Sequence, residues 1–135
     1  MTTRVFLSTL DLRDPRVCLL REALSQDAKV IVDHSPDGGE DPRFHEWYSH
    51  GLAEAVSRCD AFIAVETHGY AHSTWMASEL NSALQLANAA GAPLVLVWRS
   101  TTGPLIGFEG SMSEIQALPS TADVRAVCDA IRAAR

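Results

Sequence analysis

Short apolar runs of the β type alternate along this chain with segments of helical periodicity, and this alternation limits the possible folds most strongly. The β-type runs are Arg4–Ser8, Lys29–Asp33, Asp60–Glu66, Pro93–Trp98 and, more weakly, Ser113–Leu118. Strands joined by helical crossovers pair in parallel, because the helix returns the chain to the end of the sheet from which it started. The run Asp60–Glu66 is continuously apolar between its ends, which is typical of a strand covered on both faces.

The segments between these runs carry apolar residues at helical spacing. We expect helices from Pro15, over about Trp47–Arg58, over Thr74–Ala90 and over Thr121–Ala134. Asp14 is a suitable N-cap before Pro15, and Gly91 is a suitable helix stop. The sequence therefore predicts one α/β domain over residues 1–135. We expect a flavodoxin-like three-layer fold, with helices on both faces of a five-stranded, mainly parallel sheet in the order 2-1-3-4-5.

In an open sheet of this kind, ligands bind beyond the carboxyl ends of the strands. The loops expected to line that crevice are Thr9–Asp14, His34–Phe44, Thr67–His72 and Arg99–Gly110. The loop that follows the second strand is long and contains Pro36, Gly38, Gly39 and Pro42, so it can form neither a strand nor a helix. Long loops in compact domains tend to be functional.

Charge and hydropathy exclude several classes of partner. The 135 residues include 11 Lys and Arg against 17 Asp and Glu, which gives a formal net charge of −6. Duplex binding needs a basic surface, so we expect no nucleic-acid partner. Apolar runs fall short of the ~20 residues that cross a membrane, and the first residues lack a signal-peptide pattern, so we expect no membrane partner and a cytoplasmic location. Cys18, Cys59 and Cys128 are widely spaced, which favours buried thiols in a reducing compartment over disulfides.

Common site signatures are missing from the sequence. The chain's lysine, Lys29, lies inside an expected strand, so there is no G-x-x-x-x-G-K-[ST] phosphate loop. Neither G-x-G-x-x-G after the first strand nor G-x-S-x-G occurs. A two-component receiver would end its third strand in Asp, whereas this strand ends in Glu66. Five histidines lie between residues 34 and 72, but their spacing favours surface and capping roles, so we expect no metal site.

Glu79 is the strongest candidate for chemistry. It stands four residues after Trp75 in the expected helix Thr74–Ala90, so the two side chains share one helix face. Glu79 lies beside the apolar stripe of that helix, and partial burial there suits a catalytic carboxylate. A solvated helix glutamate, or one that caps a neighbouring backbone group, is the alternative that the residues leave open.

The run AVSRCDAFIAVETHGYAHSTWMASELNSAL resembles the central stretch of a TIR (Toll/interleukin-1 receptor) domain. The matching residues are Ala55, Val56, Ser57, Phe62–Val65, Tyr70, Ser73, Trp75, Glu79, Leu80 and Ala83. The strand that ends in Ser8, followed by Asp11 or Asp14, is similar to the opening strand of that family. The strand that ends in Asp33, before a loop with glycines, is similar to its second strand and BB loop. The resemblance covers about residues 4–98.

In TIR domains that are enzymes, a glutamate at the position of Glu79 cleaves the bond between nicotinamide and ribose in NAD. The resemblance therefore implies an NAD glycohydrolase with a role in defence or signalling. NAD would be the substrate, ADP-ribose or a cyclic form the product, and no cofactor or metal would be needed. It further implies substrate contacts at Ser8, Asp11, Asp33, Trp47, Tyr70, Ser73 and Trp75.

Two other interpretations stay open. Nucleoside 2-deoxyribosyltransferases have a similar layout and also use a glutamate in a helix after strand three. Their typical Asp-Ser-Gly-Thr is replaced here by His72-Ser73-Thr74-Trp75, which favours the TIR resemblance. Many TIR domains are instead non-enzymatic modules that self-associate through the BB loop, and the loop 33–44 would serve that role. An exposed aromatic patch at Phe44, Trp47 and Tyr48 would support such binding.

Overall fold

A computed structural model describes residues 2–9, 13–34, 54–66, 74–99, 115–119 and 121–133, apart from the side chains of residues 34, 74–78 and 115. The strands are β1 (Thr3–Ser8), β2 (Val30–His34), β3 (Ala61–Val65), β4 (Leu94–Trp98) and β5 (Ile115–Leu118). The helices are α1 (Pro15–Ser25), α3 (Thr74–Ala90) and α4 (Val124–Ala133). Residues 54–58 are also helical, at the end of the expected segment Trp47–Arg58.

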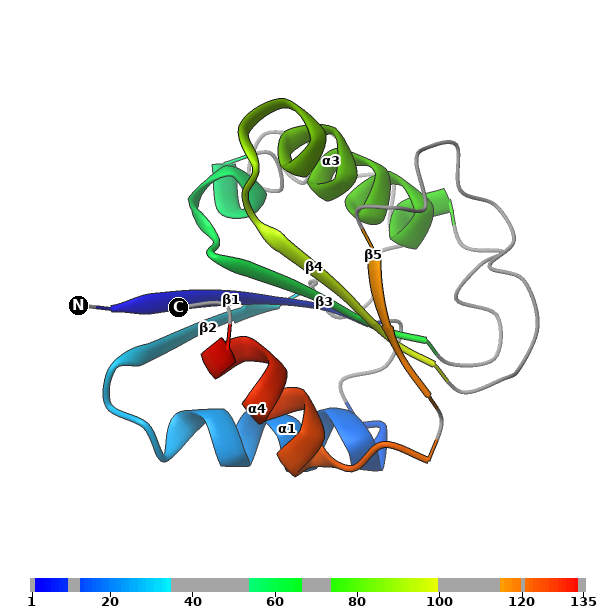
Figure 1. Cartoon of the computed structure of the whole chain (residues 1–135). Helices are drawn as coiled ribbons and strands as arrows, with labels where there is room; N and C mark the ends of the chain where they lie inside the picture. Colours follow the sequence, from blue (N-terminus) through cyan, green and yellow to red (C-terminus); the bar gives the residue numbers. More distant parts are fainter. Residues whose placement is uncertain are drawn as a thin grey trace, which may run out of the picture.

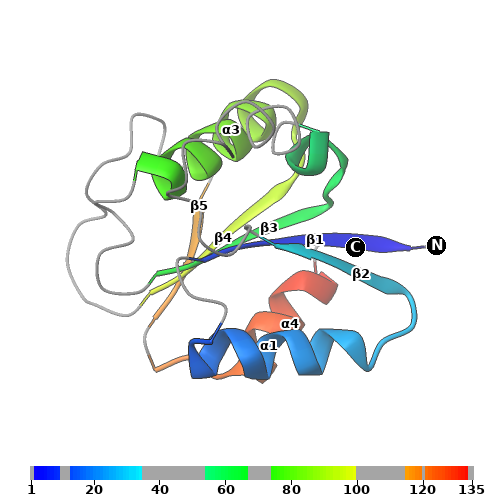
Figure 2. The same ribbon diagram turned by 180° about the vertical axis from the view of Figure 1, so that it is seen from behind.

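The five strands form one sheet in the order β2-β1-β3-β4-β5, and every neighbouring pair is parallel. Helix α3 covers one face, and α1 and α4 cover the other (Figures 1 and 2). This confirms the predicted α/β architecture and strand order. The sheet is parallel throughout the described strands rather than mainly parallel, because the chain returns to the same end of the sheet before each strand begins.

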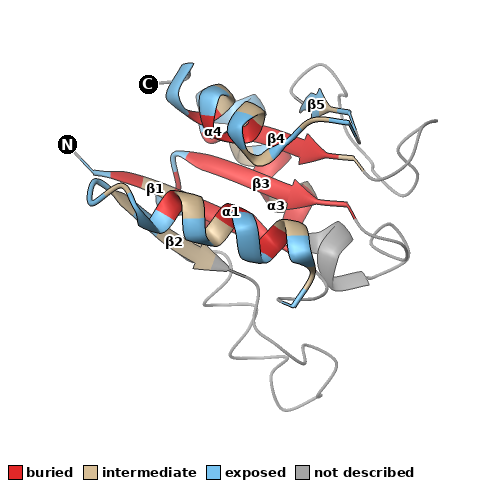
Figure 3. Cartoon of the chain, turned by 90° about the horizontal axis from the view of Figure 1, so that it is seen from below, coloured by how far each residue is buried: buried red, intermediate tan, exposed pale blue. Residues whose placement is uncertain are grey.

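Strand alternation divides the core into two layers. The layer on the α3 face includes Phe6, Phe62, Ala64, Val95 and Val97, together with Leu80 and Ala83 of α3. The layer on the α1 and α4 face includes Val5, Leu7, Ile63, Leu96 and Trp98. Figure 3 shows that β1, β3 and β4 are largely buried, whereas β2 at the sheet edge is only partly so. The continuous apolar run of β3 is therefore explained by burial on both faces.

The helix ends follow the predicted signals. The Asp14 carboxylate accepts a hydrogen bond from the backbone N–H of Arg16 at 2.9 Å, and Pro15 occupies the first turn. At the end of α3, Gly91 has a φ of +75°, and its N–H donates to the carbonyl of Ala87 at 2.9 Å. This left-handed conformation favours glycine, which has no Cβ to clash with the backbone.

The cysteines are only partly as expected. Cys59 and Cys128 are buried, whereas Cys18 is exposed, so the prediction of burial was wrong for Cys18. The turn of α1 explains this, because Val17, Leu20 and Leu24 face the core and the residue after Val17 is rotated away from it.

Within the described part of the chain, no helix has the length and apolar character needed to cross a membrane.

Burial makes Cys59 sensitive to alkaline pH. Desolvation, aided by the charge of Asp60, raises the pKa of the Cys59 thiol from 9.0 to about 12. The thiol contributes stability in full below pH 9, and this contribution is lost as pH rises towards 12, because the unfolded chain releases the proton first. When the pH is raised from 8 to 10, the unfolding free energy of Cys59→Ala should therefore fall by about 1 kcal/mol less than that of the wild type.

Urea unfolding at the two pH values measures this difference. Cys18→Ala is the matched control, because it removes an exposed thiol, and it should retain the wild-type pH dependence. Equal losses in the wild type and in Cys59→Ala would show that the Cys59 thiol does not set the alkaline limit.

Candidate functional site

Ser8 and Glu79 meet between β1 and α3, although they are 71 residues apart in the sequence. The Ser8 hydroxyl donates a hydrogen bond to Oε2 of Glu79 at 3.2 Å. Ser8 is the last residue of β1 and follows Phe6 by two positions, so alternation places it on the α3 face. The structure therefore brings together two positions that the TIR resemblance singled out.

Glu79 is more deeply buried than the sequence predicted. Its exposed fraction is 0%, as is that of Ser8, and it precedes Leu80 in the buried stripe of α3. The alternative of a solvated helix glutamate is therefore wrong. Burial of a carboxylate is costly unless hydrogen bonds compensate for the lost water, and the Ser8 hydroxyl supplies one such bond.

Asp33 shares the α3 face with Ser8 but is engaged elsewhere. In the register of β1 and β2, Asp33 lies beside Phe6, which stands two residues before Ser8 at the end of β1. Its carboxylate forms an ion pair with Arg4 at 3.7 Å, and both side chains are about one-third exposed. The predicted substrate contact of Asp33 is not tested by this arrangement.

The other predicted contacts are described in part or not at all. The backbone of Trp75 lies in α3 one turn before Glu79, but its side chain is outside the described part of the structure. Asp11, Trp47, Tyr70 and Ser73 also lie outside the described residues, as does the loop 33–44 beyond its first two residues.

Glu66 and Arg99 form a second polar pair. They directly follow β3 and β4 at the same edge of the sheet. The N–H of Glu66 donates to the carbonyl of Trp98, and the N–H of Arg99 donates to the carbonyl of Leu118, both at 2.9 Å. Nε of Arg99 lies 3.5 Å from Oε1 of Glu66, and these side chains are 15% and 11% exposed. We call the ends of β1, β3 and β4, with Ser8, Glu66 and Arg99, the carboxyl edge.

Arg16 of α1 contacts the backbone of this edge from the face of the sheet opposite α3. Its guanidinium donates to the carbonyl of Glu66 at 2.6 Å and to that of Arg99 at 3.4 Å. The same group lies over the Trp98 ring, 5.1 Å from its centroid, and Trp98 in turn donates from Nε1 to the carbonyl of Ala122 at 3.1 Å. One side chain therefore fixes the backbone at the ends of two neighbouring strands.

Sequence reasoning did not single out Glu66, Arg99 or Arg16 as site residues. The available signal was position, because Glu66 and Arg99 directly follow the expected apolar cores of strands that end at the crevice. Arg16 carried no such signal, because its partners are backbone carbonyls that lie 50 and 83 residues further along the chain.

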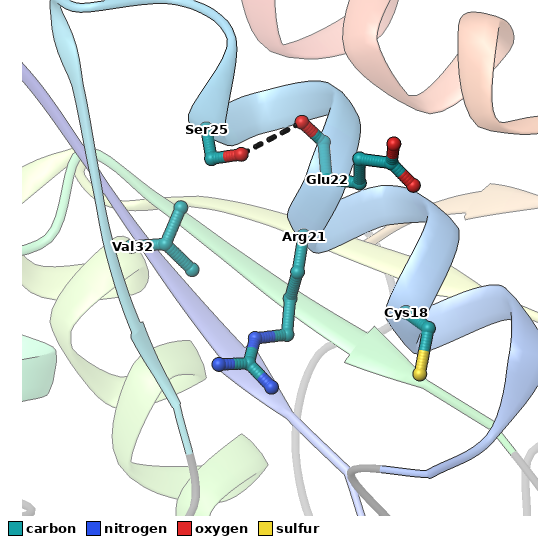
Figure 4. A pocket seen from close by; sticks show the side chains of 5 residues that line it. All are labelled: Cys18, Arg21, Glu22, Ser25 and Val32. Carbon is teal, nitrogen blue, oxygen red and sulfur yellow. Dashed lines mark hydrogen bonds between the residues drawn. The ribbon is translucent and has the colours of Figure 1, made fainter.

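Two hollows lie away from the Ser8–Glu79 pair. One is lined by Cys18, Arg21, Glu22, Ser25 and Val32, between α1 and the edge strand β2 (Figure 4). The other lies between α1 and α4, with Arg16, Leu19, Trp98 and Val124 among its lining residues. Neither hollow is lined by Ser8 or Glu79.

The comparisons with known proteins gave no family. Neither the models of known protein families nor the curated proteins contain a match to this chain. Among the described residues, no group of three or more His, Cys, Asp or Glu could hold a metal ion. Of the five histidines, only His34 lies in the described part, at the end of β2.

Proposed function

We propose that this chain is a TIR-like enzyme that cleaves the N-glycosidic bond of NAD and releases nicotinamide with ADP-ribose or a cyclic form. The observation that carries this proposal is the hydrogen-bonded Ser8–Glu79 pair beside the carboxyl edge of a parallel sheet. Such edges are where open α/β folds bind their ligands. The TIR resemblance supplies the substrate class and makes Glu79 the essential carboxylate.

The chemistry requires one carboxylate. As the bond between nicotinamide and ribose breaks, positive charge develops on the ribose, and a nearby carboxylate stabilises it. Nicotinamide leaves as a neutral base, so no general acid, cofactor or metal is required. Water then attacks the ribose, loses a proton to solvent and gives ADP-ribose. In this scheme the Ser8 hydroxyl orients the Glu79 carboxylate by donating to Oε2.

Complete burial of Glu79 sets a condition on this mechanism. A ribose can contact the carboxylate only if the carboxyl edge opens, since no part of Glu79 is exposed. Self-association through the loop 33–44 is our proposal for what completes and opens the site. A cytoplasmic location would supply NAD, and a defence or signalling role follows from the same resemblance.

Incubating concentrated protein with NAD, and following free nicotinamide by chromatography, tests the proposed function. We expect nicotinamide to be released, and release that rises steeply with protein concentration would support assembly. A parallel incubation with deoxynucleosides tests the deoxyribosyltransferase alternative through the appearance of free base. Absence of cleavage in both incubations at high protein concentration would overturn the enzymatic proposal.

Replacing Ser8 with Ala should lower the turnover number about tenfold, because the lost hydrogen bond to a carboxylate no longer orients Glu79. The KM for NAD should change little if Ser8 acts through Glu79. Ser57→Ala is the matched control, because its exposed hydroxyl donates to the carbonyl of Glu54. A rise in KM without a fall in turnover would instead assign Ser8 to substrate binding.

A non-enzymatic binding module is the second candidate, and the burial of Glu79 favours it. In that case the Ser8–Glu79 bond would serve only to satisfy two buried polar groups between β1 and α3. The protein would self-associate without cleaving NAD, which sedimentation and the nicotinamide assay together would show.

A further inference from the structure

We propose that Arg99 binds the phosphate groups of the nucleotide substrate and that Glu66 positions its guanidinium for this contact. This inference deepens the proposed function and rests on it for the identity of the nucleotide. It would make the carboxyl edge a two-part site, in which Glu79 serves the ribose and Arg99 serves the phosphates.

Strand alternation places both parts on one face of the sheet. Ser8 pairs with Ala64 in the register of β1 and β3, and Ala64 and Val97 belong to the core layer under α3. Glu66 follows Ala64 by two positions, and Arg99 follows Val97 by two. Because side chains two residues apart point to the same side of a strand, Glu66 and Arg99 lie on the α3 face, one step beyond Ser8.

A nucleotide diphosphate would need a cation at this edge. Glu66 and Glu79 are two carboxylates near the carboxyl edge of a chain with a net charge of −6, so a diphosphate would be repelled without a nearby cation. Arg99 supplies that cation beside Glu66. A guanidinium has five N–H donors in a planar fork, a geometry that suits phosphate, and Glu66 contacts this fork at Nε.

The pair is held in place more firmly than a surface ion pair. Its side chains are 15% and 11% exposed, and Arg16 fixes the carbonyls of both residues from the other face. Partly buried ion pairs add little stability compared with apolar residues of similar size, so stability alone does not account for this pair. A preorganised cation at a ligand-binding edge does account for it, because fixed groups recognise ligands best.

Calorimetric titration with ADP, which carries the diphosphate but no nicotinamide bond, tests the inference. Arg99→Gln should weaken ADP binding by about 10- to 100-fold, the usual effect of losing a charge-assisted hydrogen bond. The double variant Glu66→Gln with Arg99→Gln does not leave the Glu66 carboxylate without its Arg99 partner and should show the same loss. Arg132→Gln is the control with the same change in net charge, at a side chain that is 63% exposed, and it should bind as the wild type does.

Kinetics provide a second readout. The KM for NAD should rise about 10- to 100-fold in the double variant, with little change in turnover. Nicotinamide riboside lacks phosphate, so its cleavage should not change. Equal ADP affinity in the wild type and the double variant, or no ADP binding by the wild type, would overturn the phosphate assignment even if NAD is cleaved. ADP binding that depends on Arg99 without NAD cleavage would support the assignment and overturn the proposed function.

Discussion

Glu79→Gln should reduce nicotinamide release from NAD by at least about 100-fold, the usual loss when a group that stabilises transition-state charge is removed. The amide has nearly the volume of the carboxylate and can still hydrogen bond with the Ser8 hydroxyl. It carries no negative charge, however, and cannot stabilise the developing positive charge on the ribose. Turnover should therefore fall, while the melting temperature stays close to that of the wild type.

Burial decides which substitution is informative at this position. Glu79→Ala would leave the fold intact only if the residue lay at the helix surface. Because Glu79 has an exposed fraction of 0%, its truncation leaves a cavity between α3 and the sheet and removes one hydrogen-bond partner of Ser8. We expect Glu79→Ala to cost about 2 kcal/mol or more in unfolding free energy, so lost activity would not identify a catalytic role.

The matched control for Glu79→Gln is Glu54→Gln. It makes the same chemical change at an exposed glutamate, which is paired with Arg58 one turn later in the short helical stretch 54–58. Its activity should equal that of the wild type. Wild-type activity in Glu79→Gln would refute the proposed mechanism. If the wild type and Glu79→Gln both fold and self-associate but release no nicotinamide, the protein would be identified as a binding module.

The fold could be predicted because its signals are local in the sequence. The apolar run of β3, the cap at Asp14 and the stop at Gly91 each depend on neighbouring residues, and all three were confirmed. The TIR resemblance likewise named Ser8 and Glu79 separately, and the structure shows that they touch.

The remaining features of the site depend on contacts between distant segments. The complete burial of Glu79 results from how α3 lies on the sheet, which helical spacing alone does not determine. The Glu66–Arg99 pair depends on the register of β3 and β4, which aligns residues 33 positions apart. Arg99 was placed in an expected crevice loop, but nothing in that loop's composition indicated a carboxylate partner.

Phe62→Ala should lower the unfolding free energy by about 3–5 kcal/mol, the usual cost of truncating a buried aromatic ring. Phe62 has an exposed fraction of 0% and lies directly beside Phe6 in the register of β1 and β3. The two rings stack with centroids 5.5 Å apart and planes within 6° of parallel. The substitution removes this stack and leaves a cavity in the layer under α3.

Urea unfolding of Phe62→Ala, Phe62→Leu and Leu19→Ala separates the contribution of the buried ring from that of an exposed apolar side chain. Phe62→Leu keeps most of the apolar volume and should cost clearly less than the alanine variant. Leu19 is 56% exposed, so Leu19→Ala should change the unfolding free energy by about 0.5 kcal/mol or less. Equal costs for Phe62→Ala and Leu19→Ala would contradict the core assigned here.

Because Phe6 stands two residues before Ser8 on the same face of β1, the Phe6–Phe62 stack also supports the position of the Ser8 hydroxyl. Phe62→Ala should therefore reduce NAD cleavage even under conditions where the variant remains folded.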